Sequence, residues 1–287
     1  MNAPEVEARH HADTGTWSYV VSDPATGAAA IIDPVLDYEQ KGARTSTTSA
    51  QAMLDIVAAR GLSLRWILET HAHADHLSAA AWLKERTGAP IGIGAGIQSV
   101  QATFKPIYGL EADFPTDGSQ FDRLFEHGER FALGELEVEV IATPGHTSDS
   151  LSYRIGDAVF VGDSIFMPDG GTARCDFPGG DARVLFASIQ RLYALPDDTR
   201  VFVCHDYGPG GREPRAQTTI GEQKNANIHV RADTPEGEFV QLRTKRDATL
   251  ALPALILPAV QVNIRAGRLP PLRDDGRRYL TLPLDAL

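Results

Sequence analysis

The sequence of 287 residues contains only two cysteines, Cys175 and Cys204. Two cysteines are too few for a disulfide framework, which favours a reducing compartment. Basic residues are also in deficit, because 27 Lys and Arg stand against 38 Asp and Glu, a formal net charge of −11. This balance argues against a protein that follows the phosphates of a nucleic acid, since such proteins present a basic face.

Long apolar segments are missing as well. The longest candidate, residues 250–260, is interrupted by Pro253 and Pro258 and falls short of the roughly 20 residues that a membrane-spanning helix needs. Residues 1–16 carry several charges and no apolar segment, so they do not resemble a secretory signal. We therefore expect a cytoplasmic protein that binds neither nucleic acid nor membranes.

The most informative stretch is residues 70–76, which read Thr-His-Ala-His-Ala-Asp-His. It places four metal-ligand side chains, His71, His73, Asp75 and His76, within six positions. Neutral imidazole and carboxylate are the ligands that borderline and harder divalent metals prefer. A solvated loop with a chance excess of histidine is the simpler interpretation, but this density of ligand types between apolar segments favours a metal site.

Secondary-structure patterns place this cluster in a loop between a strand and a helix. Residues 64–69 have strand character and lead directly into the cluster, and residues 77–86 favour a helix. Residues 101–121 show no clear period and are predicted to form a loop or lid over the site. The other predicted elements are hairpins at 16–32 and 129–142, helices at 46–60 and 183–195, and strands at 91–93, 150–155, 158–161 and 200–204.

Four of the predicted strands end at a residue that can bind metal, namely His71, His146, Asp163 and His205. Residues at strand ends along one edge of a sheet can converge although they lie far apart in sequence. Taken singly, each of the last three is explained as a turn, cap or packed residue. Taken with the cluster at 71–76, they favour one shared site.

Asp33 follows the predicted strand at 28–32 and precedes Pro34. A turn-forming aspartate is the simpler interpretation of this position. Support of the metal ligands by hydrogen bonding is the alternative.

These residues resemble the metallo-β-lactamase superfamily in the order of His-x-His-x-Asp-His at 71–76, Pro-Gly-His at 144–146, Gly-Asp at 162–163 and the later His205. The resemblance implies an α/β (α+β) fold, the αββα sandwich of two mixed β-sheets with helices on the outer faces. It implies one domain over residues 1–287, in which a C-terminal helical extension, about 212–287, lines the substrate pocket. A homodimer is also expected from the resemblance.

A closer resemblance, to the bacterial glutathione-dependent persulfide dioxygenases or sulfur dioxygenases, rests on residues 30–35, 70–76, 171–181, 204–207 and 221–227. It implies an oxidoreductase of sulfide oxidation that converts glutathione persulfide and O₂ to sulfite and glutathione. One Fe(II) per chain would be held by the catalytic residues His71, His146 and Asp163. The other residues of the motif would orient these ligands: His73, Asp75, His76 and His205.

The same residues suit a two-metal thioesterase of the glyoxalase II type, which hydrolyses a glutathione thioester with two Zn(II). One metal would then be bound by His71, His73, His146 and Asp163, and the other by Asp75, His76, His205 and a bridging Asp163. The motifs alone do not choose between the two reactions. A catalytically silent metal or persulfide sensor is a third hypothesis, supported only by the two cysteines.

Glutathione is anionic, so an acidic protein needs a local cationic clamp to bind it. Arg174 is the first candidate for this clamp, followed by Tyr207, Arg215 and Lys224. Exposed Arg and Lys side chains more often only solvate a surface, and this simpler interpretation applies to Arg215 and Lys224 as well.

Overall fold

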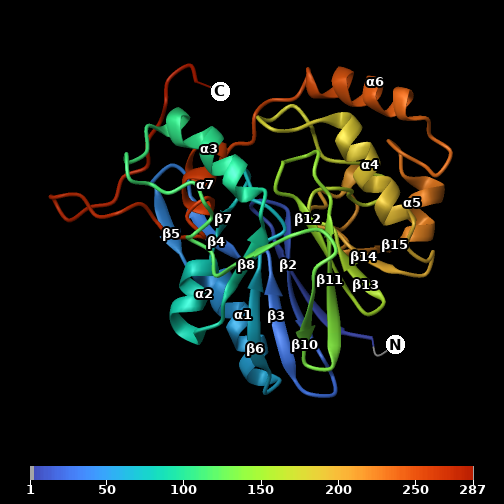
Figure 1. The fold of residues 1–287 in the computed structure, drawn as a ribbon, viewed down its shortest axis with the longest axis horizontal. Coiled ribbons are helices and arrows are strands. Elements are labelled where there is room, and N and C mark those ends of the chain that lie inside the picture. Colours follow the sequence, from blue (N-terminus) through green and yellow to red (C-terminus); the bar gives the residue numbers. More distant parts are fainter. Residues whose placement is uncertain (1–2, 287) are drawn as a thin grey trace.

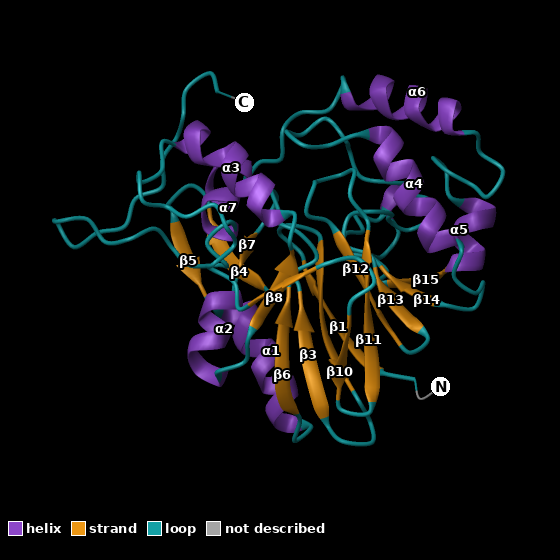
Figure 2. Ribbon diagram, viewed as in Figure 1, coloured by secondary structure: helices purple, strands orange, loops and turns teal. Residues whose placement is uncertain are grey.

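The computed structural model describes residues 3–286. Two six-stranded sheets lie face to face, and helices cover the outer face of each (Figures 1 and 2). Each sheet contains both parallel and antiparallel pairs. The predicted αββα sandwich of two mixed sheets is therefore confirmed.

The first sheet has the strand order β1-β2-β3-β6-β8-β9. Its strands are β1 (Glu5–His11), β2 (Thr16–Ser22), β3 (Ala28–Ile32), β6 (Ser63–Leu68), β8 (Ile91–Gly94) and β9 (Arg123–Phe125). Pairing is antiparallel from β1 to β3 and parallel from β3 to β9. The predicted hairpin at 16–32 is confirmed, whereas the edge strand β1, in which Val6 and Ala8 alternate with exposed charged residues, was not predicted.

The second sheet has the strand order β10-β11-β12-β13-β14-β15, and only β13 and β14 pair in parallel. Its strands are β10 (Arg130–Leu133), β11 (Leu136–Ala142), β12 (Leu151–Ile155), β13 (Ala158–Phe160), β14 (Arg200–Phe202) and β15 (Gln217–Thr219). A separate small sheet contains β5 (Arg44–Ser46), β4 (Val35–Glu39) and β7 (Leu77–Ser78).

Apolar side chains fill three layers, as a sandwich with covered faces requires. In β3, Ala30 and Ile32 point between the sheets, whereas Ile31 packs beneath the helices of the first sheet. These helices are α1 (Thr48–Ala59), α2 (Ala80–Thr87), α3 (Ile97–Tyr108) and α7 (Ile256–Asn263). The second sheet is covered by α4 (Ala182–Tyr193), α5 (Ile220–Ala226) and α6 (Glu236–Asp247), and a short 3-10 turn spans Pro209–Gly211. Among the described residues no helix has the length and apolar character to cross a membrane.

The loop predicted at residues 101–121 is wrong for its first part, because α3 continues to Tyr108 with Pro106 inside its last turns. Ile97, Val100, Phe104 and Tyr108 are buried at helical spacing. Ile97 and Val100 lie before residue 101, so the helical period is incomplete within residues 101–121. Packing of this apolar stripe outweighs the poor helix propensity of Pro106.

Four strand ends point to the same edge of the sandwich. The strands β6, β11, β13 and β14 each end three or four residues before a metal-capable side chain. Those side chains are His71, His146, Asp163 and His205. These four residues therefore lie on loops at one edge of the sandwich, and they come from both sheets.

Gly145 lets the loop after β11 pass close beneath α4. Its φ is +133°, and a Cβ atom at this position would lie 2.3 Å from the backbone nitrogen of Leu185 in α4. A side chain would therefore push apart the loop that carries His146 and the helix that covers it.

We predict that Gly145→Ala lowers the free energy of unfolding by at least about 2 kcal/mol, because strain and a backbone clash add. Gly128→Ala is the matched control, since Gly128 also has a positive φ of +81° but has open space around it. The control should lose only about 1 kcal/mol. Urea denaturation measures both, and equal losses in the two variants would contradict the clash.

Candidate metal centre

His71, His146 and Asp163 meet at the edge where β6, β11 and β13 end. Their ligand atoms all lie within 4.8 Å of one another. The Nε2 atoms of His71 and His146 lie 3.8 and 3.6 Å from Asp163 Oδ2. All three side chains are buried. The structure thus brings together the three residues for which the sequence predicted a shared role, and we call them the triad.

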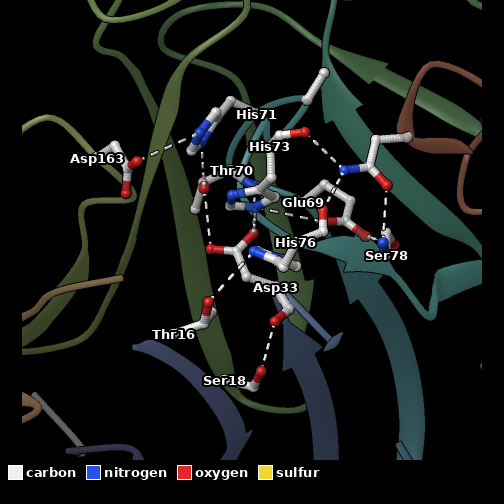
Figure 3. Close-up of polar contacts among 12 residues, drawn as sticks. Thr16, Ser18, Asp33, Glu69, Thr70, His71, His73, His76, Ser78 and Asp163 are labelled. Carbon is white, nitrogen blue, oxygen red and sulfur yellow. Dashed lines mark hydrogen bonds and ion pairs between the residues drawn. The ribbon is translucent and has the colours of Figure 1, made fainter. Parts of the chain in front are cut away.

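Each imidazole of the triad is oriented through its Nδ1 atom. His146 Nδ1 donates to the carbonyl oxygen of Arg174 at 2.7 Å. His71 Nδ1 lies 3.0 Å from Thr70 Oγ1, whose own hydrogen is donated to Asp33 Oδ2, so His71 is the donor of this bond (Figure 3). Both rings therefore keep Nε2 unprotonated and facing Asp163, as metal ligation requires.

Unsatisfied polar atoms indicate that the triad fits a metal ion. His71 Nε2 and Asp163 Oδ1 are buried and have no hydrogen-bond partner among the described residues. Such atoms are rare in folded proteins and call for an ion or another partner. Two imidazoles and one carboxylate suit a divalent transition metal with positions left open.

A second group lies beside the triad. Its ligand atoms also fall within 4.8 Å of one another, and it contains His73, Asp75, His76 and His205. His205 Nε2 is 3.1 Å from Asp75 Oδ2 and 3.4 Å from Asp163 Oδ1, so Asp163 connects the two groups. All the predicted metal-capable residues therefore meet at one edge, but His73 groups with the second set and not with the triad.

Burial sets the protonation of two of the histidines. It lowers the pKa of His71 and of His73 well below the ordinary value, with a further contribution from neighbouring imidazoles. Burial alone would raise the pKa of Asp75, but His205 and His76 outweigh it and hold that pKa well below the usual range. His71 and His73 are therefore neutral imidazoles and Asp75 is an ionised carboxylate, the forms that bind metal. Burial raises the pKa of Asp163. Burial alone would lower the pKa of His205, but Asp163 and Asp75 outweigh it and raise that pKa.

Asp33 supports this cluster from beneath (Figure 3). Its carboxylate accepts hydrogen bonds from Thr70 N at 2.7 Å, Thr70 Oγ1 at 2.9 Å and His73 Nε2 at 3.0 Å. Its φ of +49° is unusual for a residue with a side chain and persists where the surroundings dictate it. The simpler interpretation, a turn-forming aspartate alone, is therefore insufficient, and the hydrogen-bonding alternative describes the residue.

Asn263, the last residue of α7, ties the C-terminal region to the cluster. Its Nδ2 donates to the carbonyl oxygens of His73 and His76, both at 2.8 Å. Its Oδ1 accepts from Ser78 N at 2.8 Å. Sequence patterns did not reveal this residue, because its partners lie more than 180 positions away along the chain.

A cavity of about 630 Å³ opens onto the triad at His146 and Asp163. Much of its wall is apolar, including Phe166 and Phe177, and the C-terminal region supplies Ile228 and several residues between 250 and 255. The region predicted to be a C-terminal extension thus contributes to the cavity. Residues 101–121 contribute none of its lining, so the structure gives no support to a lid there.

The four predicted substrate-binding residues differ in position. Arg174 and Tyr207 line the cavity, and Arg215 and Lys224 do not. Lys224 Nζ pairs with Asp197 at 2.5 Å, and Arg215 lies 3.9 Å from Asp169. Arg174 is itself paired with Asp176, while Tyr207 stacks in parallel on His205 with 5.8 Å between ring centres.

Two further arginines of α6, Arg243 and Arg246, line the cavity and were not predicted. Arg243 is buried and paired with Asp247, whereas Arg246 forms no ion pair with any residue in the described range 3–286. Their spacing of three positions, which places them on one face of a helix, was the available signal. This spacing alone could not identify a binding residue, because only the tertiary structure places α6 at the cavity.

The model of the metallo-beta-lactamase superfamily matches residues 12–205 of this chain. A beta-lactamase hydrolase-like protein of Agrobacterium fabrum is 56% identical over 96% of this chain, which spans 64% of that protein's length. Two Xylella fastidiosa proteins of the same name are likewise spanned only to 66%. Glyoxylase B2 of Dictyostelium discoideum is 49% identical over the whole of this chain and 99% of its own length.

Persulfide dioxygenases are also similar to this chain. The human mitochondrial persulfide dioxygenase ETHE1 is 28% identical over 88% of this chain and 84% of its own length. The crystal structure of ETHE1 from Myxococcus xanthus superposes with a TM-score of 0.73 at 33% identity, covering 92% of this chain and all of that one.

We predict that Asn263→Ala weakens metal binding as well as the fold, because it leaves two loop carbonyls and one amide without partners. The unfolding free energy should fall by about 2–4 kcal/mol. Gln261→Ala is the control: Gln261 lies on the same helix but bonds Leu257 and Thr281, away from the cluster. Isothermal titration with Co(II) should show weaker binding only for Asn263→Ala, and equal binding in the two variants would refute the role of Asn263.

Proposed function

This chain belongs to the metallo-beta-lactamase superfamily, and from that premise we propose that it is a persulfide dioxygenase with one ferrous iron per chain. Its substrates are glutathione persulfide and O₂, and its products are sulfite and glutathione. The observation that carries the proposal is the grouping of His71, His146 and Asp163 without His73. Two imidazoles and one carboxylate on one side of a metal leave adjacent positions for O₂ and a sulfur ligand.

The similarity to ETHE1 of Myxococcus xanthus over nearly the whole chain, and to the human persulfide dioxygenase, supports this choice within the superfamily. The reaction balances as glutathione persulfide, O₂ and water giving glutathione, sulfite and two protons. The terminal sulfur loses four electrons, and O₂ accepts them. When bound, ferrous iron supplies the redox chemistry, whereas the protein supplies binding and orientation.

Different residues of the chain serve binding and orientation. His71 and His146 are held by Thr70 and by the Arg174 carbonyl so that both Nε2 atoms face the same point. Phe166 and Phe177 form an apolar wall that excludes water from the sulfur end of the cavity. Reactive sulfur is thereby kept from competing reactions at the deep end, and the polar part of the substrate extends toward the opening.

Arg246 is proposed to bind a carboxylate of glutathione. Of the three guanidinium groups on the cavity wall, those of Arg174 and Arg243 are already paired with Asp176 and Asp247. Arg246 has no such partner in residues 3–286, so it is available to an anionic ligand. Arg174 and Tyr207 remain additional candidates, because they line the same cavity.

A two-metal thioesterase is the second candidate. It is favoured by the second group, His73, Asp75, His76 and His205. It is also favoured by the 3.4 Å between His205 Nε2 and Asp163 Oδ1, which places Asp163 close enough to this group to bridge two metals. His73 Nδ1 is also buried without a partner. The name of the Dictyostelium relative, Glyoxylase B2, agrees with such a reaction. Two Zn(II) ions would then activate water against a glutathione thioester.

Metal content and O₂ uptake separate the two reactions. The protein purified without oxygen should contain one iron per chain and consume one O₂ for each sulfite formed from glutathione persulfide. His146→Ala should lose both iron and turnover while keeping its circular dichroism spectrum. Two zinc ions per chain, with rapid hydrolysis of S-lactoylglutathione and no O₂ uptake, would overturn the dioxygenase proposal in favour of the thioesterase.

We predict that Arg246→Ala raises the KM for glutathione persulfide about tenfold with little change in kcat, because a charge-assisted hydrogen bond made equally in the ground and transition states is lost. Lys245→Ala is the control, since Lys245 is the adjacent cation on α6 but does not line the cavity. Steady-state O₂ consumption measures both variants. An unchanged KM in Arg246→Ala would rule out this contact.

A further inference from the structure

We propose that the buried ion pair of Arg243 and Asp247 on α6 positions His146 for metal binding. The pair touches neither the triad nor the second group directly, and it acts through the segment 172–175. The inference rests on the proposed role of His146 as a metal ligand, but it holds for an iron enzyme and for a zinc enzyme alike.

The pair is deeply buried. Arg243 and Asp247 have only 1% and 4% of their surface exposed, and Arg243 is the largest fully buried side chain within residues 3–286. They lie four residues apart on α6, and their charged groups are in direct contact. Removing two charges from water is costly, and two apolar side chains of similar size would often stabilise a fold equally well. A role beyond packing is therefore worth seeking in their other contacts.

Both members of the pair bind the backbone of one loop. Arg243 Nη1 donates to the carbonyl oxygen of Thr172 at 2.9 Å. Asp247 Oδ2 accepts from the backbone nitrogen of Cys175 at 2.9 Å. His229 adds a third bond, because its Nδ1 accepts from Thr172 N at 2.9 Å. The segment 172–175 is thus held at its first and last residues.

Arg174 lies between these two anchored residues, and its carbonyl oxygen accepts the Nδ1 hydrogen of His146 at 2.7 Å. That bond sets the tautomer and the rotation of the imidazole, so that Nε2 lies 3.6 Å from Asp163 Oδ2. A shift of the loop would move the carbonyl and turn the ring away from the triad. Contacts therefore run continuously from α6, through the loop backbone, to His146.

A purely structural role would attach α6 to the rest of the protein. Other contacts already do so, because Phe239 of α6 lies in the apolar layer against the second sheet, and Glu236 pairs with Arg183 of α4 at 2.8 Å. The loop 172–175 has other contacts, from His229 to Thr172 N and from the Arg174 side chain to Asp176 and Ala251 O. Among the described residues, however, the Arg243–Asp247 pair is what bonds the backbone of this loop at both of its ends. The buried pair therefore serves to position the loop 172–175 more than to attach α6.

The test replaces both charges at once, because a single change would leave the other charge buried and unpaired. The double variant Arg243→Met with Asp247→Leu replaces both charged side chains by apolar ones and removes both loop contacts. Its affinity for Co(II), measured in the metal-free protein by chelator competition and visible absorption, should fall about 10- to 100-fold. The urea midpoint should change little.

Two comparisons make the result specific. The double variant Arg183→Met with Glu236→Leu removes an ion pair of the same helix that lies away from the loop, and it should bind Co(II) as tightly as the original protein. Asp247→Asn keeps an oxygen that can accept from Cys175 N, so it should retain more affinity than Asp247→Ala. Two results together support the proposal: a loss of Co(II) affinity in the Arg243→Met, Asp247→Leu variant, and a higher Co(II) affinity in Asp247→Asn than in Asp247→Ala.

Unchanged Co(II) affinity in a folded Arg243→Met, Asp247→Leu variant would overturn it. If that variant does not fold, equal affinities of Asp247→Asn and Asp247→Ala would overturn it instead, and a clear difference would support it. The measurement uses the metal alone, so failure of the dioxygenase reaction does not affect it. An error in the ligand assignment would appear separately, as full Co(II) affinity in His146→Ala.

Discussion

The structure depends on hydrogen bonds that hold each metal-facing imidazole by the nitrogen on its opposite side. A cluster of buried histidines and carboxylates is unfavourable by itself, because every unpaired polar atom loses its hydration. Asp33, Thr70 and the carbonyl of Arg174 satisfy the rear of this cluster and leave the front atoms free. The unsatisfied atoms are therefore gathered at one point, where a metal ion can bind them together.

This arrangement explains why the C-terminal helices matter to a site whose triad lies in the first two-thirds of the chain. Asn263 of α7 binds the loop that follows β6, and Asp247 of α6 binds the loop that supports His146. The same helices bound the cavity, and α6 supplies Arg246 to its wall. One segment thus bonds the loops that carry or support the candidate ligands and shapes the space in front of them.

In the proposed one-iron site, the position of His73 is what separates that interpretation from a two-metal site. Its Nε2 is bonded to Asp33, its Nδ1 is buried without a hydrogen-bond partner among the described residues, and its ligand atom groups with Asp75, His76 and His205 and not with the triad. A protein that needed four ligands at the first metal would have to bring a nitrogen of His73 to the triad. The carboxylate of Asp33 holds His73 in this position through its bond to Nε2.

The motifs of the sequence, through their family resemblance, predicted the sandwich, and residue patterns predicted many of its strands, though not the edge strand β1, together with the residues that meet at one edge. Alternating apolar residues define buried strands, and ligand types at strand ends are local signals that remain visible in one dimension. Tertiary structure decided the remainder: that residues up to Tyr108 are helical, that Arg215 and Lys224 lie outside the cavity, and that Arg246, Asn263 and the Arg243–Asp247 pair belong to the site. These depend on contacts between segments far apart in the chain, where neither spacing nor composition carries the information.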